Sequence, residues 1–219
     1  MGFRDIDEID DLLEERFKPK KVAAYQMSLD MHLDLLTTFQ DPEVFDLVTF
    51  KSYPLEEILV YLETTHQYYL TKVLKKIRFQ IDQLSKGKPD LFELQNSLYA
   101  FFRYFEQDLA GHIGKEERQL YPYVWQLIEC SKSPTPDTKF EEVELLDFLH
   151  DHDNQCEDVL VKLIHFLESK MMQYPDYLSL RILLNQLNFF MKDLIVHSLI
   201  EEKVLIPVAL ELEKNLIDK

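Results

Sequence analysis

The sequence predicts an all-α fold: an up-down-up-down four-helix bundle with a short helical extension at its N-terminus. Only 4 Gly and 9 Pro occur among 219 residues, too few turn residues for a many-stranded β fold. Hydrophobic residues make up 46% of the chain, which is enough for a packed core. They recur with the 3.6-residue period of amphipathic helices. We therefore expect long helices joined by short loops.

The predicted elements follow one another along the chain. Residues 1–53 form the N-terminal helical extension, in which a helical pattern over residues 20–39 ends at Asp41-Pro42, and residues 54–219 form the bundle. Pro54 suits the first turn of the first bundle helix, which ends before the Gly and Pro of residues 85–90. A second helix begins near Leu91. It is expected to end at about Tyr121, because Pro122 follows.

The second half of the bundle begins after the loop of residues 131–137. Thr138 and Glu141 make a capping box for the third helix, which ends at the Tyr-Pro-Asp of residues 174–176. The fourth helix carries a hydrophobic stripe as far as Val204, with Val208 as a candidate last member. Each helix has about 30 residues and so a length of about 45 Å.

Two segments 85 residues apart share the pattern His-x3-Glu-Glu-[Arg/Lys]-x-Leu-x-Pro, beginning at His112 and at His197. In each, the His and the Glu four residues later, Glu116 and Glu201, continue the hydrophobic stripe of their helix. A buried carboxylate is costly unless it is paired or binds a metal. The repeat therefore predicts a metal site in the core.

The partner helices supply two more His residues on their hydrophobic stripes, His66 and His152. His66 precedes His112 by 46 residues and His152 precedes His197 by 45, so the repeat extends to both halves of the bundle. In an antiparallel bundle this spacing places all four at nearly the same height. Four His and two Glu suit a pair of iron or manganese ions, whereas zinc alone would be satisfied by fewer ligands.

Several other polar residues near these motifs are not expected to bind metal. Cys156 lies one turn after His152, where a small core residue is favoured over a thiolate ligand. The others are interpreted as surface, core or hydrogen-bonding groups: His32, His150, His165, Glu117 and Glu202.

These residues resemble the hemerythrin-like superfamily and, more closely, the di-iron iron-sulfur cluster repair proteins. The resemblance covers about residues 54–210 and rests on the Leu-Glu-Thr-Thr-His-Gln-Tyr-Tyr-Leu of residues 62–70, both His-x3-Glu-Glu segments and the Asp-His-Asp of residues 151–153. It implies a non-haem di-iron centre in which the carboxylates bridge the ions. The ligands that it implies are His66, His112, His152, His197, Glu116 and Glu201.

Two departures from the family pattern concern cysteine. Oxygen-carrying hemerythrins have a fifth His at the position of Cys156, and its absence favours the repair type over the carrier. Repair proteins usually begin with a small domain that carries paired cysteines, whereas no Cys precedes Cys130 here.

Charge and targeting signals narrow the class of partner and compartment. The 40 acidic and 24 basic residues give a net charge of −16, which repels phosphate backbones and anionic lipids, so neither nucleic acid nor membrane is an expected partner. The start of the chain has no hydrophobic signal region, and no run of about 20 apolar residues follows. Two cysteines are too few for a disulfide framework. We expect a cytoplasmic protein.

Three functions remain open on the sequence. The first is protection or repair of iron-sulfur clusters under nitrosative or oxidative stress, by donation of iron or by binding and reduction of nitric oxide. The second is a sensor or carrier that binds oxygen or nitric oxide reversibly. The third is a metal-free interaction domain that acts through its acidic surface. Whether the protein is an enzyme depends on which of these holds.

Overall fold

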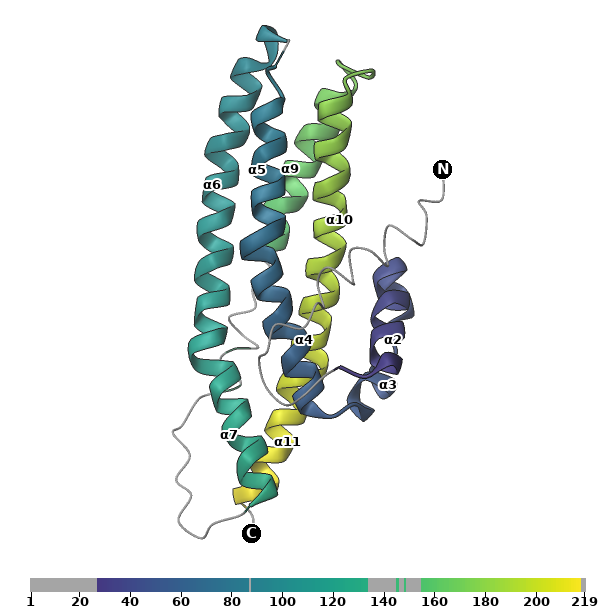
Figure 1. The fold of residues 1–219 in the computed structure, drawn as a ribbon, viewed down its shortest axis with the longest axis vertical. Helices are drawn as coiled ribbons and strands as arrows, with labels where there is room; N and C mark the ends of the chain where they lie inside the picture. Colours follow the sequence, from purple (N-terminus) through teal and green to yellow (C-terminus); the bar gives the residue numbers. More distant parts are fainter. Residues whose placement is uncertain (1–26, 87, 134–144, 146–147, 149–154, 218–219) are drawn as a thin grey trace. The chain divides into compact units, whose positions relative to one another are not determined.

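The computed structural model describes residues 27–86, 88–133, 145, 148 and 155–217, and the regular secondary structure within them is helical (Figure 1). No strand occurs within these residues, which confirms the predicted all-α class. None of the helices in this part of the chain is long and apolar enough to cross a membrane.

The chain divides into two compact units. Unit 1 comprises Met1–Tyr68, Val124–Phe140 and Val196–Lys219, and unit 2 comprises Tyr69–Tyr123 and Glu141–Ile195. The predicted division into an extension over residues 1–53 and a bundle over residues 54–219 stays a prediction.

Unit 1 is built around helix α4 and the C-terminal end of the chain. The π-helical turn η5 packs against α3, α4 and α11. The elements that contribute to unit 1 are α2 (Leu29–Gln40), the 3-10 turn η1 (Pro42–Val44), α3 (Leu47–Ser52), α4 (Leu55–Tyr68), α7 (Tyr121–Lys132) from Val124 onward, the last residues of α10 (Leu178–Ile200), η5 (Glu201–Leu205) and α11 (Ile206–Ile217).

The N-terminal helices begin and end at polar capping residues. The Ser28 hydroxyl accepts a hydrogen bond from the Met31 amide at the start of α2 (3.4 Å). Helix α2 ends at Gln40, directly before Asp41-Pro42, as predicted. The Asp46 carboxylate accepts hydrogen bonds from the amides of Val48 (3.0 Å) and Thr49 (3.3 Å) and so caps α3.

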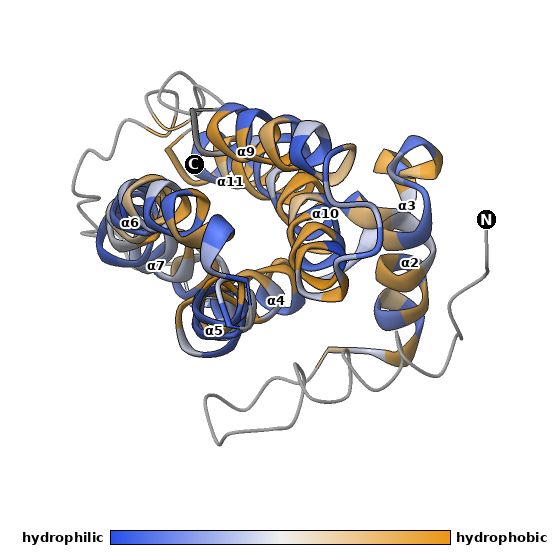
Figure 2. Ribbon diagram, turned by 90° about the horizontal axis from the view of Figure 1, so that it is seen from above, coloured by the Kyte–Doolittle hydropathy of each residue, from blue (hydrophilic) through white to orange (hydrophobic). Residues whose placement is uncertain are grey.

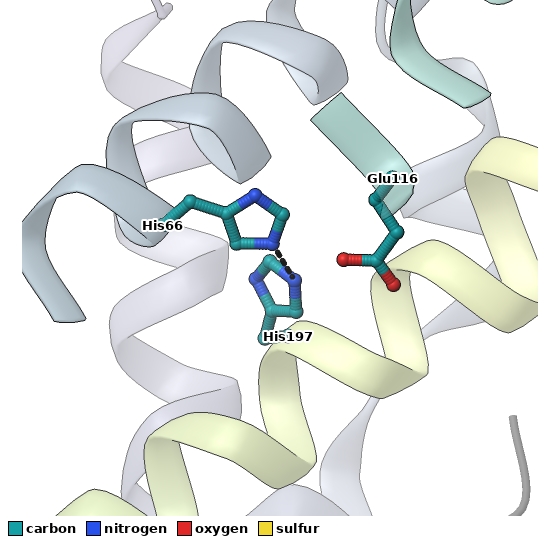
Figure 3. Close-up of side chains that lie close together, drawn as sticks. All are labelled: His66, Glu116 and His197. Carbon is teal, nitrogen blue, oxygen red and sulfur yellow. Dashed lines mark hydrogen bonds between the residues drawn. The ribbon is translucent and has the colours of Figure 1, made fainter. Parts of the chain in front are cut away.

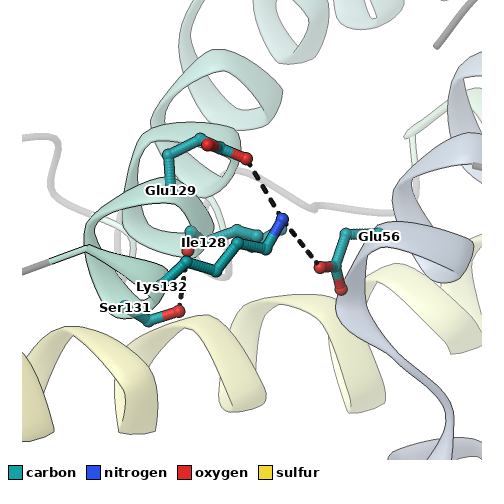
Figure 4. Close-up of polar contacts among 5 residues, drawn as sticks. All are labelled: Glu56, Ile128, Glu129, Ser131 and Lys132. Carbon is teal, nitrogen blue, oxygen red and sulfur yellow. Dashed lines mark hydrogen bonds and ion pairs between the residues drawn. The ribbon is translucent and has the colours of Figure 1, made fainter. Parts of the chain in front are cut away.

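Polar contacts join α7 to α4 within unit 1. The Lys132 ammonium lies 3.2 Å from the Glu56 carboxylate in the first turn of α4 and 3.1 Å from that of Glu129, while Ser131 donates to the carbonyl of Ile128 (Figure 4). The indole of Trp125 donates to a carboxylate oxygen of Glu63 on α4 at 2.8 Å. These contacts fix the register of α7 along α4.

Unit 2 contains the long helices α5, α6, α9 and most of α10. Helix α6 packs against both α5 and α9, and α5 and α6 run side by side (Figure 1). The elements of unit 2 are the π-helical turn η2 (Tyr69–Val73), α5 (Leu74–Gln83), the 3-10 turn η3 (Pro89–Leu91), α6 (Phe92–Lys115), the π-helical turn η4 (Glu116–Leu120), the first residues of α7, α9 (Gln155–Met171) and α10 up to Ile195.

Aromatic side chains form the core of unit 2. The Phe190 ring meets Tyr69 edge-on with ring centroids 5.1 Å apart, and it meets Phe105 edge-on at 5.9 Å. All three are buried, as their places on the predicted hydrophobic stripes require. Each such burial stabilises the fold by about 1.5–3 kcal/mol. Figure 2 shows that every long helix also carries hydrophilic residues, so that these helices are amphipathic.

One of the predicted helix ends is wrong. The sequence predicts that the second helix ends at about Tyr121, yet helix α7 continues the chain from Tyr121 to Lys132. The reason is the π-helical turn η4, in which the Tyr121 amide donates to the carbonyl of Glu116, five residues back. Pro122 would clash with the carbonyl four residues earlier in a regular α-helix. The wider turn therefore lets the helix pass through the proline.

A second π-helical turn carries the fourth helix past its own proline. In η5 the Ile206 amide donates to the carbonyl of Glu201, and α11 then continues past Pro207 as far as Ile217. Beyond this turn Ala209 is fully buried, whereas Val208, the candidate last member of the stripe, is only half-buried. A π turn adds one residue to the helical repeat. The predicted stripe is therefore correct at Val204, which is buried, and one residue out of register at Val208.

Candidate metal centre

Two buried imidazoles face each other in unit 1. His66 lies near the end of α4 and His197 near the end of α10, and their Nε2 atoms are 3.1 Å apart (Figure 3). The side chain of His66 is 1% exposed and that of His197 is 5% exposed. Two nitrogen atoms that can bind a metal ion thus lie next to each other, although their residues are 131 positions apart in the chain.

A buried carboxylate lies beside this pair. Glu201 is fully buried and follows His197 by one helical turn. Its carboxylate oxygen is 3.8 Å from Nε2 of His197. Because η5 packs against α4, the turn that carries Glu201 is held against the helix that carries His66. Two imidazoles and one carboxylate therefore gather in the interior of unit 1.

Helix α4 contributes further buried groups around the imidazoles. The Tyr61 ring is buried, and its centroid lies 6.4 Å from that of His197. The Thr65 hydroxyl, next to His66, donates to the carbonyl of Tyr61 at 2.8 Å. This hydrogen bond satisfies the hydroxyl inside the helix.

Unit 2 holds the corresponding pair of the first repeat. His112 Nε2 lies 2.8 Å from a carboxylate oxygen of Glu116, one turn later on the same helix. The carboxylate is 1% exposed, whereas the imidazole is 36% exposed. The two repeats thus share the predicted His-Glu arrangement but differ in access, because the His of the first repeat reaches solvent.

Some predicted residues lie outside the described part of the chain. They include His152, the fourth predicted His ligand, as well as His150, Asp151 and Asp153. Cys156 belongs to helix α9, and its side chain likewise lies outside the described residues. The roles of His152 and Cys156 stay predictions.

The residues that are not expected to bind metal lie away from the buried donors or at the surface. His165 is 71% exposed, and its Nδ1 atom lies 3.0 Å from the Glu168 carboxylate on α9. Glu117 is exposed, as expected from its position about 100° from Glu116 round the helix. Glu202 and His32 are half-buried.

Sequence reasoning missed one buried carboxylate and all of the π turns. Asp193 is 3% exposed and lies one turn before His197 on α10. The sequence contains a signal for this carboxylate. In each repeat an Asp lies four residues before the His, at Asp108 and at Asp193, so that both repeats begin with Asp-Leu-x2-His. Two of the three π turns, η4 and η5, had a signal too, in the proline that follows each repeat at a position an α-helix disfavours, whereas no proline follows η2.

The donor set determines what these groups can do chemically. Unit 1 contributes two buried imidazoles and a buried carboxylate, and unit 2 contributes a buried carboxylate beside a part-exposed imidazole; these are side chains that hold iron, manganese or zinc in proteins. Burial of such groups without a compensating charge or hydrogen bond is unfavourable. Buried His and Glu side chains of this chain could therefore hold metal ions.

Comparisons with models of protein families, with curated proteins and with solved structures find no match for this chain.

Proposed function

We propose that this chain is a non-haem di-iron protein that protects or repairs iron-sulfur clusters under nitrosative or oxidative stress. The observation that carries the proposal is the pair of buried imidazoles in unit 1, His66 and His197, with the carboxylate of Glu201 beside them. A duplicate His-Glu pair in unit 2, His112 and Glu116, supports a second metal position.

The proposed ligand set combines both repeats. In it the imidazoles would hold the ions, and the carboxylates of Glu116 and Glu201 would hold them too and offset their charge. The ligands are His66, His112, His152 and His197, together with Glu116 and Glu201. These donor types suit an iron pair, and they suit a mixed iron-manganese pair equally.

The side chains would act on the bound ions in different ways. A bound iron pair would supply exchangeable iron and coordination positions for nitric oxide or oxygen. The imidazoles of His66 and His197 are buried, so that they would hold an ion away from solvent. His112 is 36% exposed, so that its side chain offers a route between solvent and the interior. Such access is needed both for the release of iron and for the entry of small ligands.

Metal content tests the proposal directly. The purified protein is reconstituted with ferrous iron without oxygen, and its iron is measured by elemental analysis. We expect a pair of iron ions per chain, with an optical spectrum that changes on oxidation. A protein that retains no iron would refute the proposal and favour the metal-free interaction domain.

The proposed activity is separated from reversible ligand binding by a second measurement. Loss of iron to a chelator within minutes from the reduced protein would support donation, and production of nitrous oxide from nitric oxide would support reduction. Retention of iron for hours, together with reversible binding of oxygen or nitric oxide, would instead identify a sensor or carrier.

A further inference from the structure

Each His-x3-Glu-Glu repeat ends in a proline, and a π-helical turn comes shortly before that proline. Each of these turns begins at a Glu that is a proposed metal ligand. Turn η5 begins at Glu201 and is followed, after one residue, by Pro207; turn η4 begins at Glu116 and is followed in the same way by Pro122. The same arrangement therefore occurs twice, once in each unit. Single π turns inside α-helices are rare and occur frequently at functional sites.

Backbone hydrogen bonds explain why a proline stabilises such a turn. In an α-helix the ring of Pro207 would clash with the carbonyl of Lys203, four residues earlier. In η5 the Ile206 amide instead donates to the carbonyl of Glu201, which widens the turn directly before the proline. Pro207 thus disfavours the regular α-helix, which would otherwise be the more stable form of this segment.

The π turn also decides which residues share a face of the helix. In a regular α-helix Val208 would lie about 20° from Glu201 round the axis, and Ala209 about 80° away. The structure instead buries Ala209 fully and leaves Val208 half-buried. The extra residue of η5 therefore brings Glu201 and the hydrophobic face of α11 to the same side.

We propose that Pro207 and Pro122 are positioning residues for the metal centre. Each proline stabilises the π turn before it. That turn keeps the His and Glu of the repeat on the same side of the helix as the buried hydrophobic residues that follow the turn. In unit 1 the His-Glu face must meet His66 on α4, while Ile206 and Ala209 must stay in the core. A helix without the π turn meets only one of these requirements at a time. This inference rests on the proposed function for its metal readout.

The test combines a substitution with a compensating deletion. Pro207→Ala removes the clash, so that η5 relaxes towards an α-helix and the two faces lose register. Metal affinity is expected to fall about 10-fold or more, the range found when residues that orient ligands are lost. Deletion of Lys203, which is 56% exposed, from the Pro207→Ala variant removes the extra residue and is expected to restore the affinity.

Two comparisons make the result specific. Pro54→Ala serves as the matched control, because Pro54 precedes the first turn of α4, where proline fits a regular helix. Its metal affinity is expected to equal that of the wild type. Pro122→Ala repeats the test in the first repeat, should Pro207→Ala fail to fold.

The inference is overturned if Pro207→Ala binds metal as the wild type does, or if the Lys203 deletion fails to restore binding. Crystal structures of the metal-free variants provide a readout that does not depend on metal. We expect the Ile206 amide of Pro207→Ala to donate to Glu202 instead of Glu201. A π turn that persists without the proline would refute the inference, whether or not the wild type binds iron.

Discussion

Individual side chains in this protein combine burial with ionisable chemistry. His66, His197, Glu116 and Glu201 are all 5% exposed or less, although charged and imidazole groups usually stay at the surface. Selection for a stable core alone would favour apolar residues at these positions. At these positions they could hold metal ions.

Substitution of Glu201 tests whether a buried carboxylate of this protein binds metal. Glu201→Gln keeps the shape of the side chain and removes its charge, so the metal-free variant should be at least as stable as the metal-free wild type. Saturating ferrous iron should raise the unfolding free energy of the wild type by about 2.7 kcal/mol at a hundredfold excess over the dissociation constant. The variant should show little of this gain in thermal unfolding.

Glu202→Gln is the matched control for this prediction, because Glu202 is the next residue in the same π turn but is half-buried. It should keep the full response to iron. An equal response of Glu201→Gln and the wild type would show that the Glu201 carboxylate does not bind the metal.

At the scale of the elements, polar contacts add to the buried apolar side chains that hold the short N-terminal helices. Helix α3 has only six residues, too few to be stable by itself, yet it packs against η5, the turn that carries Glu201. Tyr53 caps the end of α3, and its hydroxyl donates a hydrogen bond to the Asp34 carboxylate on α2. This contact ties the two N-terminal helices together.

Partial burial, the hydrogen bond to Asp34 and the nearby negative charges raise the pKa of Tyr53 well above its usual value of about 10. The neutral phenol is thus favoured in the folded state. Its contribution to stability is fully present below pH 10 and is lost as the pH rises further. Tyr53→Phe should lower the unfolding free energy by about 1 kcal/mol at neutral pH, and the difference from the wild type should shrink above pH 10.

Chemical unfolding at neutral and at alkaline pH measures both effects. Tyr104→Phe is the control, since Tyr104 is 59% exposed, and it should change the unfolding free energy little at either pH. If the destabilisation by Tyr53→Phe stayed constant up to pH 12, ionisation of Tyr53 would not be linked to folding.

Over the whole molecule, the net charge of −16 acts against compactness. Within the described residues, buried Glu116, Asp193 and Glu201 account for only three of the 40 acidic residues of the chain, so the remaining 37 still exceed the 24 basic ones. Self-repulsion of this size lowers stability and is screened by salt, because the Debye length falls from about 30 Å at 0.01 M to about 3 Å at 1 M.

We therefore expect the thermal unfolding midpoint of the metal-free protein to rise when sodium chloride is increased from about 0.01 M to about 0.5 M. Potassium chloride at the same ionic strength serves as the control and should give the same shift, since screening does not depend on the identity of the cation. A midpoint that fell with salt would mean that attractive ion pairs, such as Lys132 with Glu56, outweigh the repulsion.

The helical class and the faces within each helix follow from the amino-acid sequence alone. Hydrophobic residues at a 3.6-residue period can be buried along one side only by a helix, and a His followed four residues later by a Glu must share its face. For this reason the spacing is sufficient to single out His112 with Glu116, and His197 with Glu201.

The passage of the helices through the two prolines, and the meeting of distant residues, depend instead on tertiary packing. The π turns at Glu116 and Glu201 require contacts on both sides of the turn, since a proline alone is equally compatible with the end of a helix. The 3.1 Å approach of His66 and His197, 131 residues apart, likewise requires two helices to pack. Local propensity acts over a few residues, whereas these features arise from contacts between segments that are far apart in the chain.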